Sequence, residues 1–142
     1  MDEIYERARR ELESLWWLDK AIDSRIAHCQ QLREKISNLS ASGTNEPVSG
    51  TKLSDIADGV AKLVDYEQEL QREIQEYIDR RKCIVLRIHT LPNSAQANVL
   101  YYHYVLGMSD TETANKMGYV VRHIKRLRQD GLMEYGEKFC YY

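Results

Sequence analysis

Two long segments with apolar residues at alternating spacings of three and four dominate the first two thirds of this 142-residue chain. The only polar interruptions of the two repeats are Arg25 in the first and Glu67 and Arg81 in the second. A repeat of about 3.5 residues sustained over this many turns is typical of coiled-coil helices. We therefore predict an all-α fold that begins with two long helices. The apolar positions are Leu15, Leu18, Ile22, Cys29, Leu32, Ile36 and Leu39, then Leu53, Ile56, Val60, Leu63, Leu70, Ile74, Tyr77, Ile84, Ile88 and Leu91.

The segment between the two repeats reads "SASGTNEPVSG", which is small and polar with one proline. Such a composition predicts a flexible link, at residues 40–52, that lets the helices fold back as an antiparallel hairpin over residues 1–92. Further apolar residues lie beside the repeats and exceed what a two-stranded coiled coil buries, so we expect them to meet either a second copy of the chain or the C-terminal module. They are Trp16, Trp17, Ile26, Val64, Ile78 and Val85.

A second domain is predicted over residues 93–142. Pro92 moves the residue before it out of the helical conformation, and Asn93 or Ser94 is placed to cap the next helix. We expect a helix over residues 95–106, closed by Gly107 in a left-handed conformation. Its three tyrosines suit either a platform for stacking nucleic-acid bases or a protein core, and the core is favoured. They are Tyr101, Tyr102 and Tyr104.

The stretch "MSDTETANKMGYVVRHIKRLRQDGL" predicts two short helices joined by a tight turn. Ser109 and Glu112 form a capping box, in which each side chain satisfies a backbone N–H at the start of a helix. This helix is expected to last to about Met117, since Gly118 supplies the positive φ that a tight turn requires. The layout is that of a helix-turn-helix.

The second of these helices is expected to run from Val120 or Val121 to Gln129, with Gly131 ending it. Small Ala114 allows the two helices to approach, while Ile124 and Leu127 face inward. The opposite face is then basic, and it carries side chains that bond guanine edges or neutralise phosphates. The residues predicted to bind double-stranded DNA are Val121, Arg122, His123, Lys125, Arg126, Arg128 and Gln129.

Net charge gives no general attraction to nucleic acid, because 20 Lys and Arg face 22 Asp and Glu. Any DNA affinity must be local, and between Tyr119 and Gly131 four basic residues face Asp130 as the single acid. A basic outer face is also common on solvated helices of structural bundles. That alternative stays open on the pattern alone.

Other classes of function find little support in the sequence. Cys29, Cys83 and Cys140 are far apart and lack a CxxC pair, so we expect reduced thiols, with no disulfide framework, metal or cofactor. No apolar run has the roughly 20 residues of a membrane span. Nucleotide-binding and catalytic motifs are missing too, so neither an enzyme nor a small-molecule substrate is expected. A cytoplasmic location follows as an expectation.

The stretch "YYHYVLGMSDTETANKMGYVVRHIKRL", from Tyr101 to Leu127, resembles the phage-encoded transcriptional regulators of the ArpU/RinA type. Their C-terminal helix-turn-helix is similar to region 4 of bacterial sigma-70 factors. The likeness covers roughly residues 20 to 132 and includes the helical hairpin. It implies sequence-specific DNA binding and activation of phage or prophage late genes in the bacterial host cell, with the host RNA polymerase as partner.

The resemblance places Gly118 at the turn, and Arg122 and Arg126 on the recognition helix. The chain departs from the family pattern at Thr113, where an aliphatic residue is usual, and at Val120, where a capping Ser is usual. Lys125 and Arg128 stand where Tyr and His are usual, so the preferred DNA sequence of the family does not carry over.

Two alternatives belong to other classes of protein. A small terminase subunit, which packages phage DNA, also joins a helix-turn-helix to coiled helices and would form a closed ring. A coiled-coil adaptor would bind another protein through the hairpin and would have no affinity for DNA.

Overall fold

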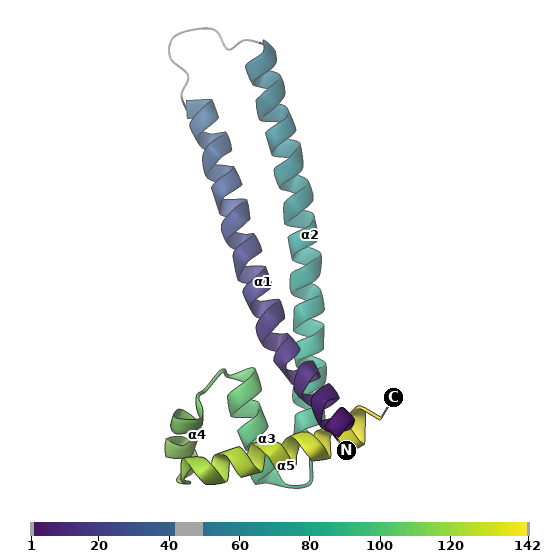
Figure 1. The fold of residues 1–142 in the computed structure, drawn as a ribbon. Coiled ribbons are helices and arrows are strands. Elements are labelled where there is room, and N and C mark those ends of the chain that lie inside the picture. Colours follow the sequence, from purple (N-terminus) through teal and green to yellow (C-terminus); the bar gives the residue numbers. More distant parts are fainter. Residues whose placement is uncertain (1, 42–49, 142) are drawn as a thin grey trace. The chain divides into compact units, whose positions relative to one another are not determined.

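The computed structural model describes residues 2–41 and 50–141, and every regular element in them is helical. The order is α1 (Asp2–Ala41), α2 (Gly50–His89), α3 (Ser94–Leu100), the π-helix η1 (Tyr101–Val105), α4 (Asp110–Met117) and α5 (Val121–Phe139) (Figure 1). The predicted all-α fold, a long antiparallel hairpin followed by a helix-turn-helix module, is confirmed. Of the predicted link at 40–52, residues 42–49 lie outside the described part, and the flanking residues belong to α1 and α2.

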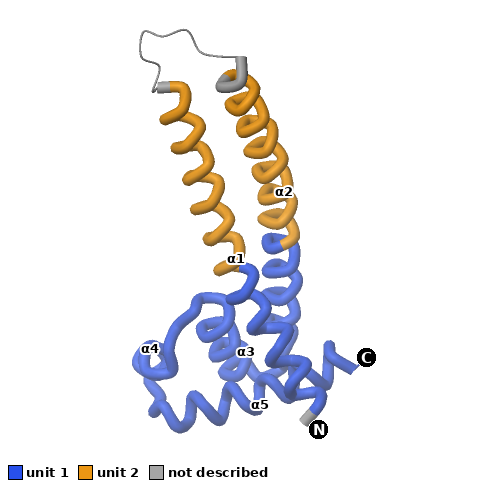
Figure 2. The backbone as a smooth tube through the Cα atoms, turned by 45° about the horizontal axis from the view of Figure 1, so that its top comes forward, with its two compact units in different colours: residues 1–18, 77–142 blue, residues 19–76 orange. Residues whose placement is uncertain are grey.

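The chain divides into two compact units (Figure 2). Unit 1 comprises residues 1–18 and 77–142, and unit 2 comprises residues 19–76. Both boundaries fall inside the long helices, because the start of α1 and the end of α2 pack with the C-terminal helices. The domains predicted from the sequence, 1–92 and 93–142, rest on the break at Pro92 and stay a prediction.

The main core of unit 1 joins the base of the hairpin to the C-terminal helices. The side chains of this core come from α1, the end of α2 and the turn after it, α3, η1 and the second half of α5. The buried members are Ala8, Leu12, Leu15, Ile84, Ile88, Leu91, Ala97, Leu100, Tyr104, Leu132 and Tyr135. The apolar pattern of α1 therefore starts before Leu15, where the sequence analysis placed its first member.

The prediction that Gly131 ends the last helix is wrong. α5 continues through Gly131 to Phe139, and Leu132 and Tyr135 are 1% and 0% exposed. A glycine inside a helix costs about 1 kcal/mol, whereas burying one large apolar side chain gains about 1.5–3 kcal/mol. Gly131 instead allows close packing, since a Cβ there would lie 3.2 Å from Leu100 Cγ.

The helix predicted at residues 95–106 is present, but only its first part is an α-helix. Asn93 caps α3 by accepting the Gln96 N–H at 3.2 Å, as one of the two expected caps. The second part is η1, in which Leu106 N–H donates to the Tyr101 carbonyl at 3.1 Å, five residues back. Gly107 closes the segment with φ 68°, as predicted.

Unit 2 consists of an antiparallel pair, the second part of α1 and the first part of α2. Arg25 and Glu67, two of the polar interruptions in the repeats, form ion pairs across it with Glu73 and Arg33. Among the described residues of unit 2, the buried apolar side chains are Ile22, Cys29 and Leu70. Among the described residues, no helix is at once long enough and apolar enough to cross a membrane.

Candidate nucleic-acid interface

A small apolar core holds α3, α4 and α5 together. Val99 of α3, Ala114 of α4, and Ile124 and Leu127 of α5 are buried in it, with Val99 at 0% and Ile124 at 1% exposure. The structure thus places Ala114, Ile124 and Leu127 on the inward faces that the sequence analysis assigned to them. These three helices form a scaffold on which the outer face of α5 is presented.

Ser109 caps the first helix of the pair. Its Oγ accepts the Glu112 N–H at 3.1 Å, while its hydroxyl donates to Glu112 Oε1 at 3.1 Å. The first half of the predicted capping box is therefore present, but the Glu112 carboxylate accepts from the Ser109 hydroxyl instead of the Ser109 N–H. Thr113, which replaces the usual aliphatic residue, is 1% exposed and donates its hydroxyl proton to the Ser109 carbonyl at 2.8 Å.

The turn between α4 and α5 spans three residues, 118–120. Gly118 has φ 72°, and its N–H and that of Tyr119 both donate to the Ala114 carbonyl, at 3.0 Å for Tyr119. A Cβ at Gly118 would meet nothing within 4 Å, so glycine is required here for its backbone conformation and not for space.

α5 starts without a side-chain cap. Val120 occupies the cap position with ψ 153°, and its side chain is 70% exposed. His123 and Ile124 donate their N–H groups to the Val120 carbonyl at 3.0 and 3.2 Å. The positive end of the helix dipole thus lies at the surface beside the basic residues.

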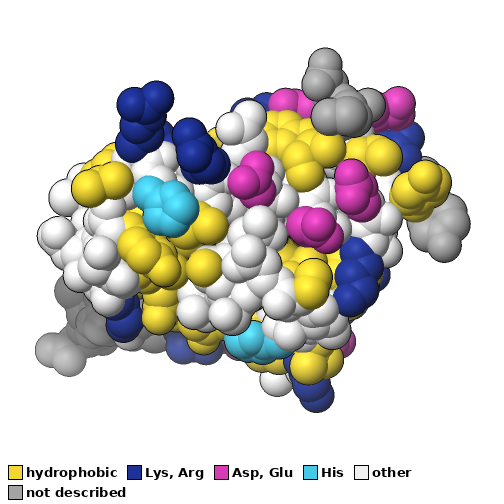
Figure 3. All heavy atoms as spheres, turned by 90° about the horizontal axis from the view of Figure 1, so that it is seen from below, with side chains coloured by type: hydrophobic (Ala, Val, Ile, Leu, Met, Phe, Trp, Pro, Cys, Tyr) yellow, Lys and Arg dark blue, Asp and Glu magenta, His cyan; other side chains and the backbone are white. Residues whose placement is uncertain are grey.

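Four of the seven predicted DNA-contacting residues have exposed side chains: Arg122, Lys125, Arg126 and Gln129. Val121 and His123 are half-buried, and His123 packs edge-on against Tyr119 with ring centroids 4.8 Å apart. Figure 3 shows one face of the molecule, on which Lys and Arg side chains lie beside a histidine near one edge and Asp and Glu side chains lie nearer the middle. The four exposed side chains define what we call the basic face of α5.

The seventh residue, Arg128, has a different environment. It is half-buried and forms an ion pair with Asp110 at the start of α4, so it links the two helices. His103 of η1 completes the cluster, with Nδ1 3.2 Å from the Met108 carbonyl oxygen and 3.9 Å from Asp110 Oδ1. Burial lowers the pKa of His103, and the charge of Arg128 lowers it further.

Sequence reasoning missed this cluster because Asp110 had the ordinary position of an acid in the first turn of a helix. Its pairing with Arg128, 18 residues away, depends on how α4 and α5 cross. A sequence carries no local signal for such a pair. Arg128 is accordingly left out of the basic face.

The tyrosines of the third helix mostly serve packing. Tyr104 is 3% exposed, and Trp16 both stacks on its ring at 5.2 Å and donates its Nε1–H to the Tyr104 carbonyl at 3.1 Å. Tyr101 and Tyr102 are half-buried, and Lys116 Nζ lies 5.2 Å from the centroid of the Tyr102 ring. The contact of Trp16 also supports docking of the C-terminal module as one use of the extra apolar residues.

A search of the described side chains finds no group of three or more His, Cys, Asp and Glu that would hold a metal ion. Models of known protein families, curated proteins and solved structures give no match to this chain.

Proposed function

We propose that this protein is a sequence-specific DNA-binding transcriptional regulator that places α5 in the major groove. The observation that carries the proposal is the basic face of α5, exposed on the second helix of a helix-turn-helix scaffold. Recognition helices of this class contact base edges from their N-terminal part, which is where Arg122 and Arg126 lie.

The order of charges along α5 supports an anionic partner. Residues 121–129 contain four basic and no acidic residues, whereas residues 130–139 contain Asp130, Glu134 and Glu137 against Lys138. The helix dipole favours the reverse order, with acids near the N-terminus and bases near the C-terminus. Apart from Arg128, which pairs with Asp110, the basic residues among 121–129 are not placed to favour the helix dipole, and binding of phosphates offers a reason for them.

The exposed side chains of the basic face suit different groups on DNA. Arg122 and Arg126 are four residues apart, so they lie on one side of α5 and suit bidentate bonding to guanine. Lys125 is a compact charge that suits a phosphate. Gln129 suits the adenine edge.

We further infer a role in activating phage or prophage late genes with the bacterial RNA polymerase. This part rests on the resemblance of residues 101–127 to the ArpU/RinA-type regulators. Transcription by purified polymerase from a template carrying the binding site tests it. The protein should raise the yield of transcript, and an unchanged or lowered yield would reject activation while leaving DNA binding intact.

DNA binding is tested by fluorescence anisotropy across a salt series. The probes are DNA fragments from the genomic neighbourhood of this protein's own gene and unrelated duplex DNA. A preference of at least about tenfold for one fragment is expected, since specific sites exceed non-specific ones by far more in this class. Replacing Arg122 and Arg126 together with Ala should lower the affinity for that fragment by about tenfold or more per side chain and reduce the preference.

Lys125→Ala should weaken binding to every fragment and reduce the salt slope by about one unit. Lys82→Ala is the matched control, because Lys82 is an exposed lysine of α2 in the same unit. It removes the same charge and should leave the slope unchanged. Equal effects of the two Lys variants, or full binding by the double Arg variant, would refute the assignment of the basic face.

A further inference from the structure

Unit 2 buries few side chains for its size. Three of its described apolar side chains are buried, compared with fifteen in unit 1. A pair of helices has a small core, and much of the apolar surface of unit 2 stays exposed. Unit 2 therefore has apolar surface free for packing with a further surface.

One side of α2 supplies such a surface. Leu53, Ala57, Val60 and Val64 follow each other at spacings of four, three and four, which places them on one side of the helix. The side chains of Leu53, Val60 and Val64 are 57%, 43% and 44% exposed. A stripe of this kind is typical of a helix that packs against another helix.

The stripe belongs to the same flank of the hairpin as Ile26 of α1, which is 36% exposed. The ion pair between Arg33 and Glu67 shows this, because Arg33 lies seven residues after Ile26 and Glu67 seven residues after Val60. Seven residues are about two helical turns, so each pair shares one side of its helix. We call the part of this flank that α2 forms, with Leu53, Ala57, Val60 and Val64, the neutral flank.

Charged residues of α2 avoid the neutral flank. At about 100° per residue, the arc that holds the stripe also holds Ala61, Glu67, Gln68, Gln71 and Gln75. Glu67 is the one charged residue among them, and Arg33 pairs with it. The other charged side chains described in α2 up to residue 76 fall on the rest of the helix. They are Asp55, Asp58, Lys62, Asp65, Glu69, Arg72, Glu73 and Glu76.

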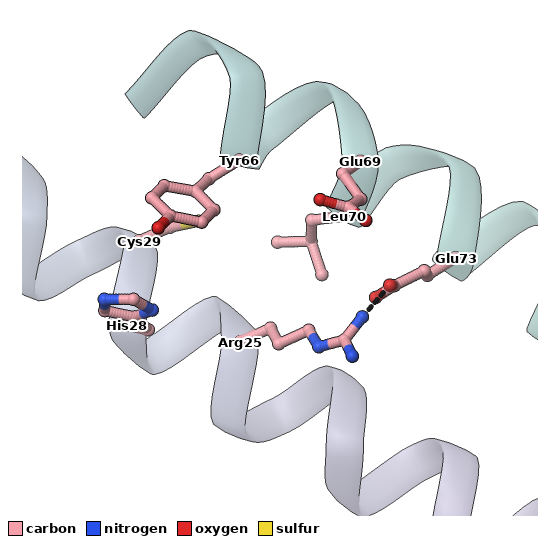
Figure 4. Close-up of a pocket in the computed structure, with 7 residues that line it drawn as sticks. All are labelled: Arg25, His28, Cys29, Tyr66, Glu69, Leu70 and Glu73. Atoms are coloured by element: carbon pink, nitrogen blue, oxygen red, sulfur yellow. Dashed lines mark ion pairs between the residues drawn. The ribbon is translucent and has the colours of Figure 1, made fainter. Parts of the chain in front are cut away.

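The opposite flank has a different character, as Figure 4 shows. There Arg25 pairs with Glu73, and His28 faces Tyr66 with ring centroids 5.4 Å apart, around a hollow that Glu69 also lines. Depletion of charge with retention of apolar side chains is the compositional mark of an interface core. The two flanks of unit 2 thus differ as a buried side differs from a solvated one.

We propose that the neutral flank binds the neutral flank of a second copy of this chain, giving a four-helix bundle. Glu67 is the one charged residue of α2 on the neutral flank, and it already pairs with Arg33, so a strongly charged partner would find no free charge of α2 there, whereas a second copy presents the same uncharged surface. Two-fold pairing of one patch with itself is the commonest form of self-association in soluble proteins. The stripe combines Leu53 and Val60 of the repeat with Ala57 and Val64 beside it, and an apolar surface wider than a two-stranded coiled coil buries is typical of helices in such bundles.

Sedimentation velocity of the full chain without DNA tests the proposal, at concentrations from one to tens of micromolar. The expected species has twice the 16.7 kDa mass of the chain. Val64→Glu should shift the dissociation constant at least about tenfold upward and yield single chains, because it buries a charge in the interface. Tyr66→Glu is the matched control on the opposite flank, where the side chain is 46% exposed, and it should remain a dimer.

Single chains throughout this range for the unchanged protein would overturn the proposal, and so would a ring of many copies. Equal dissociation of the Val64→Glu and Tyr66→Glu variants would also overturn it. If circular dichroism shows that Val64→Glu is unfolded, Ala57→Glu replaces it, with Ala27→Glu as control. Both alanines are exposed and glutamate is a good helix former, so a difference in mass between these variants reports the interface alone.

Discussion

Replacing Gly136 with Ala tests whether α5 is held against the start of α1 by close backbone contact. A Cβ at this position would lie 2.5 Å from Ile4 Cγ2, 2.7 Å from the Ile4 carbonyl oxygen and 3.2 Å from the Ile4 carbonyl carbon. The side-chain carbon can rotate away. The carbonyl belongs to α1, so relieving that contact requires the two helices to separate.

The net effect follows from two opposing contributions to the free energy of unfolding. Alanine gains about 1 kcal/mol over glycine inside a helix. Overpacking a closed contact costs about 1–3 kcal/mol, and a clash with backbone belongs at or above the upper end. We expect Gly136→Ala to lower the stability of unit 1 by about 2 kcal/mol.

Gly131→Ala is the control within the same helix. Its Cβ would meet side-chain atoms of Leu100 and Gln96 at 3.2–3.3 Å, which can shift by a few tenths of an ångström. The gain in helix propensity should roughly cancel this cost, leaving stability within about 0.5 kcal/mol of the unchanged protein. Urea unfolding followed by circular dichroism measures both. Equal stability of the two variants would refute the argument that backbone contact at Ile4 limits residue 136.

Three further outcomes follow from single contacts in unit 1. The pKa of His103 in the folded protein lies below its ordinary 6.5. The neutral imidazole therefore contributes its full stability above pH 6.5, and this contribution is lost as the pH falls through the folded-state pKa. In the His103→Gln variant the melting temperature should depend less on pH between about pH 7 and pH 5 than in the unchanged protein. Trp16→Phe removes the hydrogen bond to the Tyr104 carbonyl and should cost about 1 kcal/mol in urea unfolding, and an unchanged midpoint would count against that bond. Val120→Ser supplies the missing cap of α5 and should add about 1 kcal/mol, whereas Val120→Ala should not; equal melting temperatures would contradict this.

The candidate site joins features that the sequence makes visible with others that it hides. Gly118 and the exposed basic residues of α5 follow from local spacing, because a turn and a helix face are set by neighbouring residues. Arg128 looked equivalent to Arg126 by charge alone. Its pairing with Asp110 removes it from the exposed surface, and only the packing of α4 on α5 creates that pair.

The sequence by itself determined the elements whose signals are local. The repeats from Leu15 to Leu91 predict two long helices. Asn93 and Ser109 cap the starts of two further helices. Gly107 and Gly118 form two turns because each adopts a left-handed backbone conformation. Each of these depends on residues within a few positions, where propensity and capping decide the outcome.

The tertiary structure alone decided where α5 ends and how the chain divides into units. A glycine after a basic helix is a common stop, but burial of Leu132 and Tyr135 in one core with Leu12 and Ile88 outweighs the cost of Gly131 inside the helix. The same burial draws residues 1–18 into one unit with the C-terminal helices. These residues are far apart in the sequence, and the free energy of their burial exists only once the helices pack.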